Sequence, residues 1–370
     1  MFWLAIAGVM YPYAGYPFLL LMLRSVLNRT VNVRAADLPS VSMIIPVHNE
    51  AVRIEQKIAN TAALDYPRDR LEVIFVSDGS TDRTADIIGP HVGQRLSLIE
   101  LTARRGKAAA LNAGLGEATG EVVVFTDASI VLEPGSLLAI VAAFGDPTVG
   151  CVSGEDRIAD SGAEGLYGRY ELFLRRLESD VHSIVGASGS FYAQRRALCG
   201  PFLDGMAPDF LSVLRTVERG YRALSEPTAV GLMSSVKDPR HEFDRKVRTL
   251  LRGMTVLFAH PALLNPLRNR IFAAELWSHK ILRWTVPFCL IAALAAPLAL
   301  LQRPFYQAAL VMQLVFYGIA LAALLEWGNV RSSWLGRVAL YFATVNAAIL
   351  VAWYQYASGE RQELWTPSHR

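Results

Sequence analysis

The sequence has few of the features that mark secreted, metal-cluster or nucleic-acid-binding proteins. It contains three cysteines, Cys151, Cys199 and Cys289, and their spacing fits neither a disulfide framework nor a metal motif. This cysteine usage is typical of a reducing cytoplasm. The formal net charge is +3, which is too small to indicate a nucleic-acid partner. Secreted disulfide scaffolds and nucleic-acid-binding proteins are therefore excluded.

Charged residues are also missing from residues 1–23, and the first arginines follow at positions 24, 29 and 34. Because no basic leader precedes this apolar stretch, we expect a retained membrane anchor and not a cleaved signal peptide. Three more apolar runs, at about 285–302, 304–325 and 338–357, approach the roughly 20 residues that span a bilayer. The chain is predicted to be an integral membrane protein of a bacterial inner membrane.

Positive charge marks the cytoplasmic side of a membrane protein. Arg24, Arg29 and Arg34 therefore place residues 38–242 in the cytoplasm. Charged residues inside the spans are few, which disfavours a transporter.

The chain also lacks a Walker loop and a Gly-x-Gly-x-x-Gly motif, which disfavours a P-loop ATPase and a classical dehydrogenase. Apolar runs at about 41–46, 71–76, 96–101 and 121–126 alternate with predicted helices, and 149–153 is expected to form a fifth strand. This alternation predicts an α/β fold with a parallel, doubly wound sheet.

Acidic residues end two of the predicted strands. Asp78 closes the second strand and Asp127 the fourth, so both are expected at the carboxyl edge of the sheet, where such folds bind ligands. Taken alone, Asp127 is better explained as a cap of the next turn, and Asp78 belongs to an Asp-Gly turn dipeptide that Ser80 or Thr81 can follow as a helix cap. Between them, Gly106 and Lys107 precede a helix whose N-terminus favours an anion such as phosphate.

Four motifs in this order resemble family 2 glycosyltransferases, and most closely the membrane-embedded, processive-type branch of cellulose, chitin and hyaluronan synthases. They are Ile44–Glu50, Val76–Asp82, Gly106–Asn112 and Phe125–Ser129. The resemblance extends over about 38–283. It implies a GT-A-like, Rossmann-like parallel-sheet catalytic domain with one N-terminal and three C-terminal transmembrane helices. The expected divisions are an anchor with linker (1–37), a catalytic domain (38–240), an amphipathic interfacial region (241–283) and a three-helix membrane region with tail (284–370).

The resemblance also implies how a nucleotide sugar is bound. The residues expected to contact it are Pro46, Glu50, Asp78, Lys107, Asp127 and Arg248. Asp127 is expected to hold Mg²⁺ or Mn²⁺ against the diphosphate. The family's metal motif is Asp-x-Asp, and Ser129 stands here at the third position. A serine hydroxyl is a poorer ligand for a hard cation than a carboxylate.

On the acceptor side, the small residues of Gly186–Tyr192 are similar to a loop that such enzymes place beside the acceptor, which assigns Gly189 and Ser190 to acceptor binding. The alternative is a plain turn into a strand. By position, Asp209 matches the catalytic base that takes a proton from the acceptor hydroxyl. Local sequence explains Asp209 equally well as a helix N-cap.

The segment 241–260 is predicted to be an amphipathic helix at the membrane surface, with its apolar stripe towards lipid. Arg245, Arg248 and Arg252 fall on the opposite face, towards the soluble domain. Arg245, Arg248 and Thr249 occupy the positions of the family's Gln-x-x-Arg-Trp element, which implies that Arg245 and Arg248 contact the diphosphate. An alternative is that the arginines bind anionic lipid headgroups.

These patterns together predict an inverting hexosyltransferase that moves a sugar from a UDP-sugar to a glycan or lipid-linked acceptor in polysaccharide synthesis. Membrane lipids are expected partners. Because one chain supplies only four spans, a complete glycan channel would need a second copy, which predicts a homo-oligomer. Two alternatives stay open: single-sugar transfer to a polyprenyl phosphate, and a non-catalytic subunit that senses sugar nucleotides or assists assembly.

Overall fold

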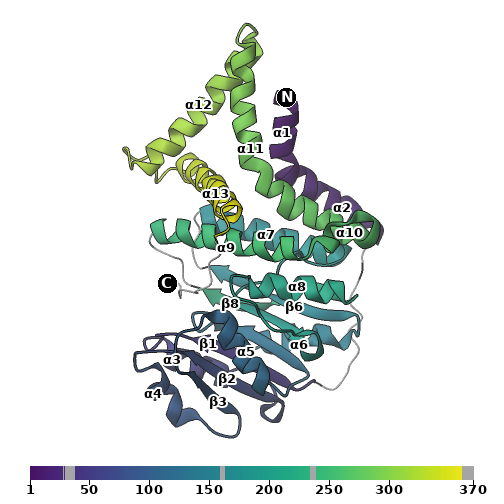
Figure 1. Ribbon diagram of the computed structural model, residues 1–370, viewed down its shortest axis with the longest axis vertical. Helices are drawn as coiled ribbons and strands as arrows, with labels where there is room; N and C mark the ends of the chain where they lie inside the picture. Colours follow the sequence, from purple (N-terminus) through teal and green to yellow (C-terminus); the bar gives the residue numbers. More distant parts are fainter. Residues whose placement is uncertain (28, 30–37, 159–162, 234–238, 361–370) are drawn as a thin grey trace.

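The computed structural model describes residues 1–27, 29, 38–158, 163–233 and 239–360. Arg34, which entered the prediction of membrane orientation, lies outside these residues. The described chain forms one mixed eight-stranded sheet flanked by helices, with long apolar helices projecting from one side (Figure 1). The strand order is β3-β2-β1-β4-β7-β6-β8-β5.

The first half of the sheet is parallel. It consists of β1 (Val41–Val47), β2 (Leu71–Asp78), β3 (Leu96–Leu101) and β4 (Val122–Thr126). The strands β2 and β4 flank β1 and pair with it in parallel, and β3 pairs in parallel with β2. These are the four strands predicted from the sequence, and the intervening helices are α3 (Ile54–Ala62), α4 (Thr84–Ile88) and α5 (Lys107–Glu117).

The second half departs from the predicted all-parallel sheet. It comprises β5 (Val131–Leu132), β6 (Val149–Ile158), β7 (Phe191–Arg195) and β8 (Arg222–Met233). The strand β7 runs antiparallel to both β4 and β6, and β5 runs antiparallel to β8. These antiparallel pairs are additions that the sequence did not predict: β7 follows the loop 186–190, which brings the chain back beside β4 at the site edge.

Both faces of the sheet are covered, so alternate residues of its central strands enter different cores. In β1, Ile44 packs in the core that α5 and α8 (Pro208–Glu218) share, whereas Met43 and Ile45 pack in the core that α3 and α6 (Ser136–Ala142) share. This alternation follows from the two-residue period of a strand. It explains why β1, apart from Ser42, is an apolar run that is buried on both sides.

Among the residues that the structure describes, four helices are long and apolar enough to cross a membrane: Phe2–Leu27, Pro266–Leu300, Pro304–Leu324 and Trp334–Ala357. They contain α1 (Phe2–Met10), α2 (Tyr16–Leu27), α10 (Pro266–Leu276), α11 (Leu282–Ala295), α12 (Pro304–Leu324) and α13 (Trp334–Ala357). The second helix begins well before the apolar run predicted at 285, and its Glu275, His279 and Arg283 are buried against protein. The predicted one plus three arrangement is confirmed.

The amphipathic helix is present as α9 (Pro239–Ala259), but its apolar stripe does not face lipid. Leu251 and Met254 are fully buried in a core that also contains Trp284 of α11 and Ile349 of α13. Figure 1 shows α9 and α7 (Ala163–Val181) lying between the sheet and the long helices. The sequence could not distinguish a lipid boundary from the apolar surface of a neighbouring helix.

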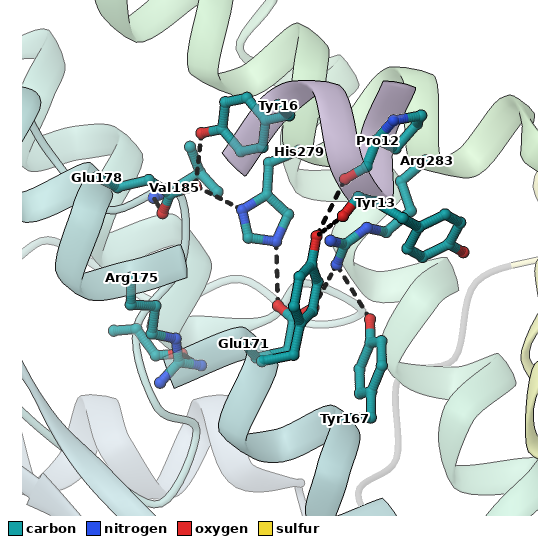
Figure 2. Close-up of polar contacts among 12 residues, drawn as sticks. Pro12, Tyr13, Tyr16, Tyr167, Glu171, Arg175, Glu178, Val185, His279 and Arg283 are labelled. Carbon is teal, nitrogen blue, oxygen red and sulfur yellow. Dashed lines mark hydrogen bonds and ion pairs between the residues drawn. The ribbon is translucent and has the colours of Figure 1, made fainter. Parts of the chain in front are cut away.

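A buried polar cluster joins α7 to the first two membrane helices (Figure 2). His279 contacts Glu178 Oε1 through Nδ1 at 2.6 Å and Glu171 Oε2 through Nε2 at 3.1 Å. Tyr16 donates to Glu178 Oε1 at 2.7 Å, and Arg283 donates to Glu171 and to the Tyr167 hydroxyl. Burial favours the neutral form of Glu171, but Arg283 and His279 hold its pKa well below the usual value. The cluster therefore anchors the domain by ion pairs.

Two glycines on α5 test how closely this helix packs on the sheet. A Cβ added at Gly114 would come within 2.6 Å of Ile44 Cγ2, whereas one added at Gly116 meets nothing within 4 Å. We expect Gly114→Ala to destabilise the fold by about 1–3 kcal/mol through overpacking. Gly116→Ala, the matched control, is expected to be neutral or slightly stabilising because alanine favours helix. Thermal unfolding midpoints of both variants measure this, and equal shifts would contradict the packing of α5.

Candidate functional site

The candidate site lies where the strand order reverses between β1 and β4. In an open α/β sheet this switch point forms a crevice at the carboxyl ends of the strands. A small pocket opens there, which we call the cleft. Its lining residues come from β1, α5, β4 and the turn after it, β7 and the loop before it, and the start of α8. They are Pro46, Lys107, Leu111, Phe125, Thr126, Asp127, Gly189, Tyr192, Pro208 and Asp209.

The central contact of the cleft joins Lys107 to Asp127. Lys107 is the first residue of α5, and its Nζ lies 2.5 Å from Asp127 Oδ1 and 3.1 Å from the carbonyl oxygen of Gly189. The backbone N–H of Asp127 donates to the carbonyl oxygen of Ser190 at 3.1 Å. The fold therefore brings together three predicted elements: Lys107 for phosphate, Asp127 for the metal, and the acceptor loop that contains Gly189 and Ser190.

Asp209 lies on the other side of the loop 186–190, in the first turn of α8. The N-cap of α8 is Ala207, and Pro208 is its first residue, so Asp209 is not the N-cap that local sequence allowed. Its carboxylate carbon lies 3.9 Å from the position that a Gly189 Cβ would occupy. Burial raises the pKa of Asp209, while the charges of Lys107, Arg175 and Lys280 oppose this shift. A carboxyl group with a raised pKa is a better proton acceptor.

The Asp78 carboxylate is fully buried and supports the site indirectly. Its oxygens accept hydrogen bonds from the backbone N–H groups of Arg105 at 2.7 Å and Gly106 at 2.8 Å. A Cβ at Gly79, where φ is +59°, would come within 2.5 Å of the Arg104 nitrogen, so glycine is required there. Asp78 thus holds the loop that leads into Lys107, and it does not line the cleft. Its predicted contact with the nucleotide stays a prediction.

Other predicted ligands lie outside the lining of the cleft. Glu50 is buried at the end of β1 and forms an ion pair with Arg53 at 3.1 Å. Ser129 is half-buried two residues after Asp127. These placements leave the predicted roles of Glu50 and Ser129 open.

The arginines of α9 differ in their surroundings. Arg245 donates to Glu242 of its own helix at 2.9 Å and 2.8 Å. The pKa of Arg248 is lowered by burial and by the neighbouring charge of Arg245. Arg252, one helical turn further, is the arginine on which the charge of Asp209 acts. Among the α9 arginines, Arg252 is thus the one that interacts electrostatically with Asp209 of the cleft. Arg248 does not line the cleft.

The residues at Asp127 fit a divalent cation that arrives with a diphosphate. Within the described residues, no group of three or more His, Cys, Asp or Glu side chains could hold a metal by itself. Mg²⁺, however, is often bound by one or two carboxylates together with substrate phosphates and waters. Asp127 lines the cleft and can supply one such carboxylate, whereas the predicted contribution of Ser129 stays a prediction.

Comparison with known proteins assigns a family to the part of the chain that contains most of the cleft. Residues 42–200 match the family model "Glycosyl transferase family 2". This part of the chain is a family 2 glycosyltransferase domain. The match confirms the resemblance seen in the sequence, and it covers every lining residue of the cleft except Pro208 and Asp209.

Two curated relatives and one solved structure are similar to this chain. "Probable glycosyltransferase YdaM" of Bacillus subtilis is 36% identical over 34% of this chain and 31% of its own length. A poly-beta-1,6-N-acetyl-D-glucosamine synthase of Staphylococcus aureus is 29% identical over 64% of this chain and 60% of its own length. This chain therefore spans less than two thirds of either relative.

The solved structure is the mannosyltransferase PcManGT of Pyrobaculum calidifontis, in complex with GDP-Man and Mn²⁺. It is 29% identical, with a TM-score of 0.75, and the likeness covers 96% of this chain and 99% of that one. This likeness includes the membrane helices and confirms the predicted GT-A-like fold.

One residue of the family 2 domain was missed by sequence reasoning. Lys57 of α3 is 1% exposed and donates to Thr126 Oγ1 at 3.1 Å and to the Ile130 carbonyl oxygen at 2.8 Å. It thereby brackets the turn that carries Asp127 and Ser129. The only available signal was a lysine at a position where the helical pattern calls for an apolar residue.

The buried Lys57 makes a prediction about pH. Burial lowers its pKa from 10.5 to about 7, opposed by the charge of Asp127. Between these values the unfolded chain binds a proton that the folded chain does not, so stability is predicted to rise with pH through this range. Lys57→Met removes this contribution. We expect the unfolding midpoint of the native protein to rise relative to that of the variant between about pH 7 and 10. A constant difference would contradict the lowered pKa.

Proposed function

We propose that the protein is an inverting glycosyltransferase that moves a sugar from a nucleoside-diphosphate sugar to a membrane-associated acceptor on the cytoplasmic side. The observation that carries this proposal is the cleft itself. It combines a cation for phosphate, a carboxylate for a metal and a buried carboxyl group with a raised pKa around one pocket. The family assignment of residues 42–200 supports the reaction class.

The proposed transfer uses Asp209 as the base. The acceptor hydroxyl gives its proton to the Asp209 carboxylate while its oxygen forms a bond to the anomeric carbon of the donor sugar. The bond between that carbon and the diphosphate breaks on the opposite face, so the anomeric configuration is inverted. The Lys107 ammonium group, which contacts Asp127, then also stabilises the negative charge of the departing diphosphate. A divalent ion, when bound, would neutralise further charge on the diphosphate.

The proposal also specifies the nucleoside base and the sugar of the donor. The sequence favours a UDP-sugar, whereas the structurally similar mannosyltransferase was solved with GDP-Man and Mn²⁺. We propose a UDP-linked hexose as the first donor to test and GDP-mannose as the second. Asp78 and Glu50 are proposed to shape the nucleotide side, with Arg248 and Arg245 reaching the diphosphate when a donor is bound.

The acceptor reaches this cleft from the membrane side. Gly189 has no side chain in front of Asp209, so an acceptor sugar can approach the backbone of the loop closely at this point. Synthesis of a polysaccharide is supported by the similarity to the poly-N-acetylglucosamine synthase.

Transfer of one sugar to a polyprenyl phosphate is the second candidate, and it is favoured by the cations beside Asp209. Radiolabel in a chloroform-soluble monosaccharide-lipid, with no polymer, would select it.

Asp209→Asn tests the assignment of the base. We expect kcat to fall roughly 10²- to 10⁴-fold because the amide cannot take the proton, while the Kd for the donor stays unchanged. Release of nucleoside diphosphate from labelled donor measures this. Glu218→Gln, at the far end of α8, is the control and is expected to retain activity. Unchanged release in Asp209→Asn would exclude Asp209 as the base, and absence of release in the native protein would favour the non-catalytic alternative.

Ser129→Asp tests the metal site. A second carboxylate at this position is expected to lower the Mn²⁺ concentration needed for half-maximal activity, because anionic oxygen ligands bind hard cations more strongly. Ser129→Asn, which adds a neutral oxygen ligand, should shift this concentration less. Titration of the EDTA-treated protein with Mn²⁺ gives both values. An unchanged requirement in Ser129→Asp would place the metal away from Ser129.

A further inference from the structure

A lysine of the second membrane helix lies near Asp209, the proposed catalytic base, and forms no ion pair with a carboxylate in the described structure. Lys280 belongs to the turn Trp277–Ile281 between α10 and α11. Its Nζ lies 5.2 Å from the centre of the Phe210 ring and 3.4 Å from the position of a Gly186 Cβ. Phe210 directly follows Asp209, and Gly186 begins the acceptor loop. Within the described residues, Lys280 makes no hydrogen bond or ion pair.

Arg175 of α7 provides a second cation on the same loop. Its Nη2 donates one long hydrogen bond, of 3.4 Å, to the carbonyl oxygen of Ala187. Figure 2 shows Arg175 pointing away from the buried cluster, while Glu171 and Glu178 of the same helix point into it. A guanidinium group has five N–H donors, so most of the hydrogen-bonding capacity of Arg175 is unused in the described structure.

The nearest carboxylates on α7 are already engaged. Glu171 accepts from Arg283 and His279, and Glu178 accepts from Tyr16 and contacts His279. The charges of Arg175 and Lys280 both act on Asp209, and the charges of Glu171 and Glu178 act on Lys280 although neither carboxylate bonds to it in the described structure. Cations removed from water are costly unless an anion accompanies them. A ligand with negative charge would therefore complete this group.

The position of the two cations identifies which part of a substrate they would meet. Lys280 is part of the helix Pro266–Leu300, which is long and apolar enough to cross a membrane. An ionisable residue in such a helix indicates a functional site. Lys107 and Asp127 already provide the groups for the donor diphosphate at the sheet edge. Arg175 and Lys280 instead lie against Gly186 and Ala187, at the start of the acceptor loop.

We propose that Arg175 and Lys280 bind the phosphate of a lipid-linked sugar acceptor, so that the terminal hydroxyl of its sugar reaches Asp209. This inference rests on the proposed glycosyl transfer and adds the chemical class of the acceptor: a sugar joined to its lipid through phosphate or diphosphate. The phosphate is not changed in the reaction. The hydroxyl proton still passes to Asp209, and the donor diphosphate still leaves from the other side.

The test compares two synthetic acceptors that carry the same sugar and the same lipid chain. One is linked through phosphate and the other through a neutral ether glycoside. Transfer of labelled sugar is measured with the full chain in lipid nanodiscs, for the native protein, Arg175→Gln, Lys280→Gln and Lys280→Arg. The control is Arg169→Gln, an exposed arginine on the same helix. Donor hydrolysis by water is measured in parallel as a readout that does not involve the acceptor.

We expect the native protein to prefer the phosphate-linked acceptor. Arg175→Gln and Lys280→Gln should each raise its KM roughly tenfold or more, as expected for loss of a charge-assisted contact. Their donor hydrolysis should stay near the native level, and their kcat/KM for the neutral acceptor should change far less than that for the phosphate-linked acceptor. Lys280→Arg and Arg169→Gln should resemble the native protein.

Three results would overturn the inference: no preference for the phosphate-linked acceptor, equal losses with both acceptors, or impaired donor hydrolysis in the variants. Equal losses with impaired hydrolysis would assign the two cations to the donor diphosphate. Absence of both transfer and donor hydrolysis in the native protein would instead refute the proposed function as a whole.

Discussion

The ion pairs between α7 and the helix Pro266–Leu300 determine how the catalytic domain sits on the membrane helices. Arg283 would be costly in a bilayer, and Glu171 neutralises it from the domain side, while His279 contacts both Glu171 and Glu178. Removing one partner of such a buried pair is usually far more destabilising than the pair is stabilising. This contact therefore fixes the turn that carries Lys280 above the acceptor loop and Asp209.

Much of the site half of the sheet was predictable from the sequence. Its strands are short runs of β-branched residues, and the acids that end them must gather at one edge once the strands are parallel. The convergence of Lys107 and Asp127 followed from that rule, since Asp127 directly follows β4 and Lys107 begins the helix after the loop that leaves β3. Asp209 depended on the family resemblance, because its local sequence explains a helix cap equally well.

The remaining features depend on packing that no local pattern encodes. The apolar stripe of α9 contacts Trp284 and Ile349 in place of lipid, and both surfaces favour the same residues. Asp78 carries the charge of a ligand, yet its oxygens bind the backbone of the loop before Lys107. Lys57 and Lys280 come from distant segments, and only the folded chain shows that each lies beside an aspartate of the site.

The central claim is that one cleft between β1 and β4 binds the donor and presents it to Asp209. The most direct measurement is a structure of the protein with Mn²⁺ and a non-hydrolysable nucleotide sugar. Our account predicts diphosphate oxygens within about 3 Å of Lys107 Nζ, the ion against Asp127, and the anomeric carbon facing Asp209. A nucleotide bound elsewhere, or a sugar turned away from Asp209, would contradict it.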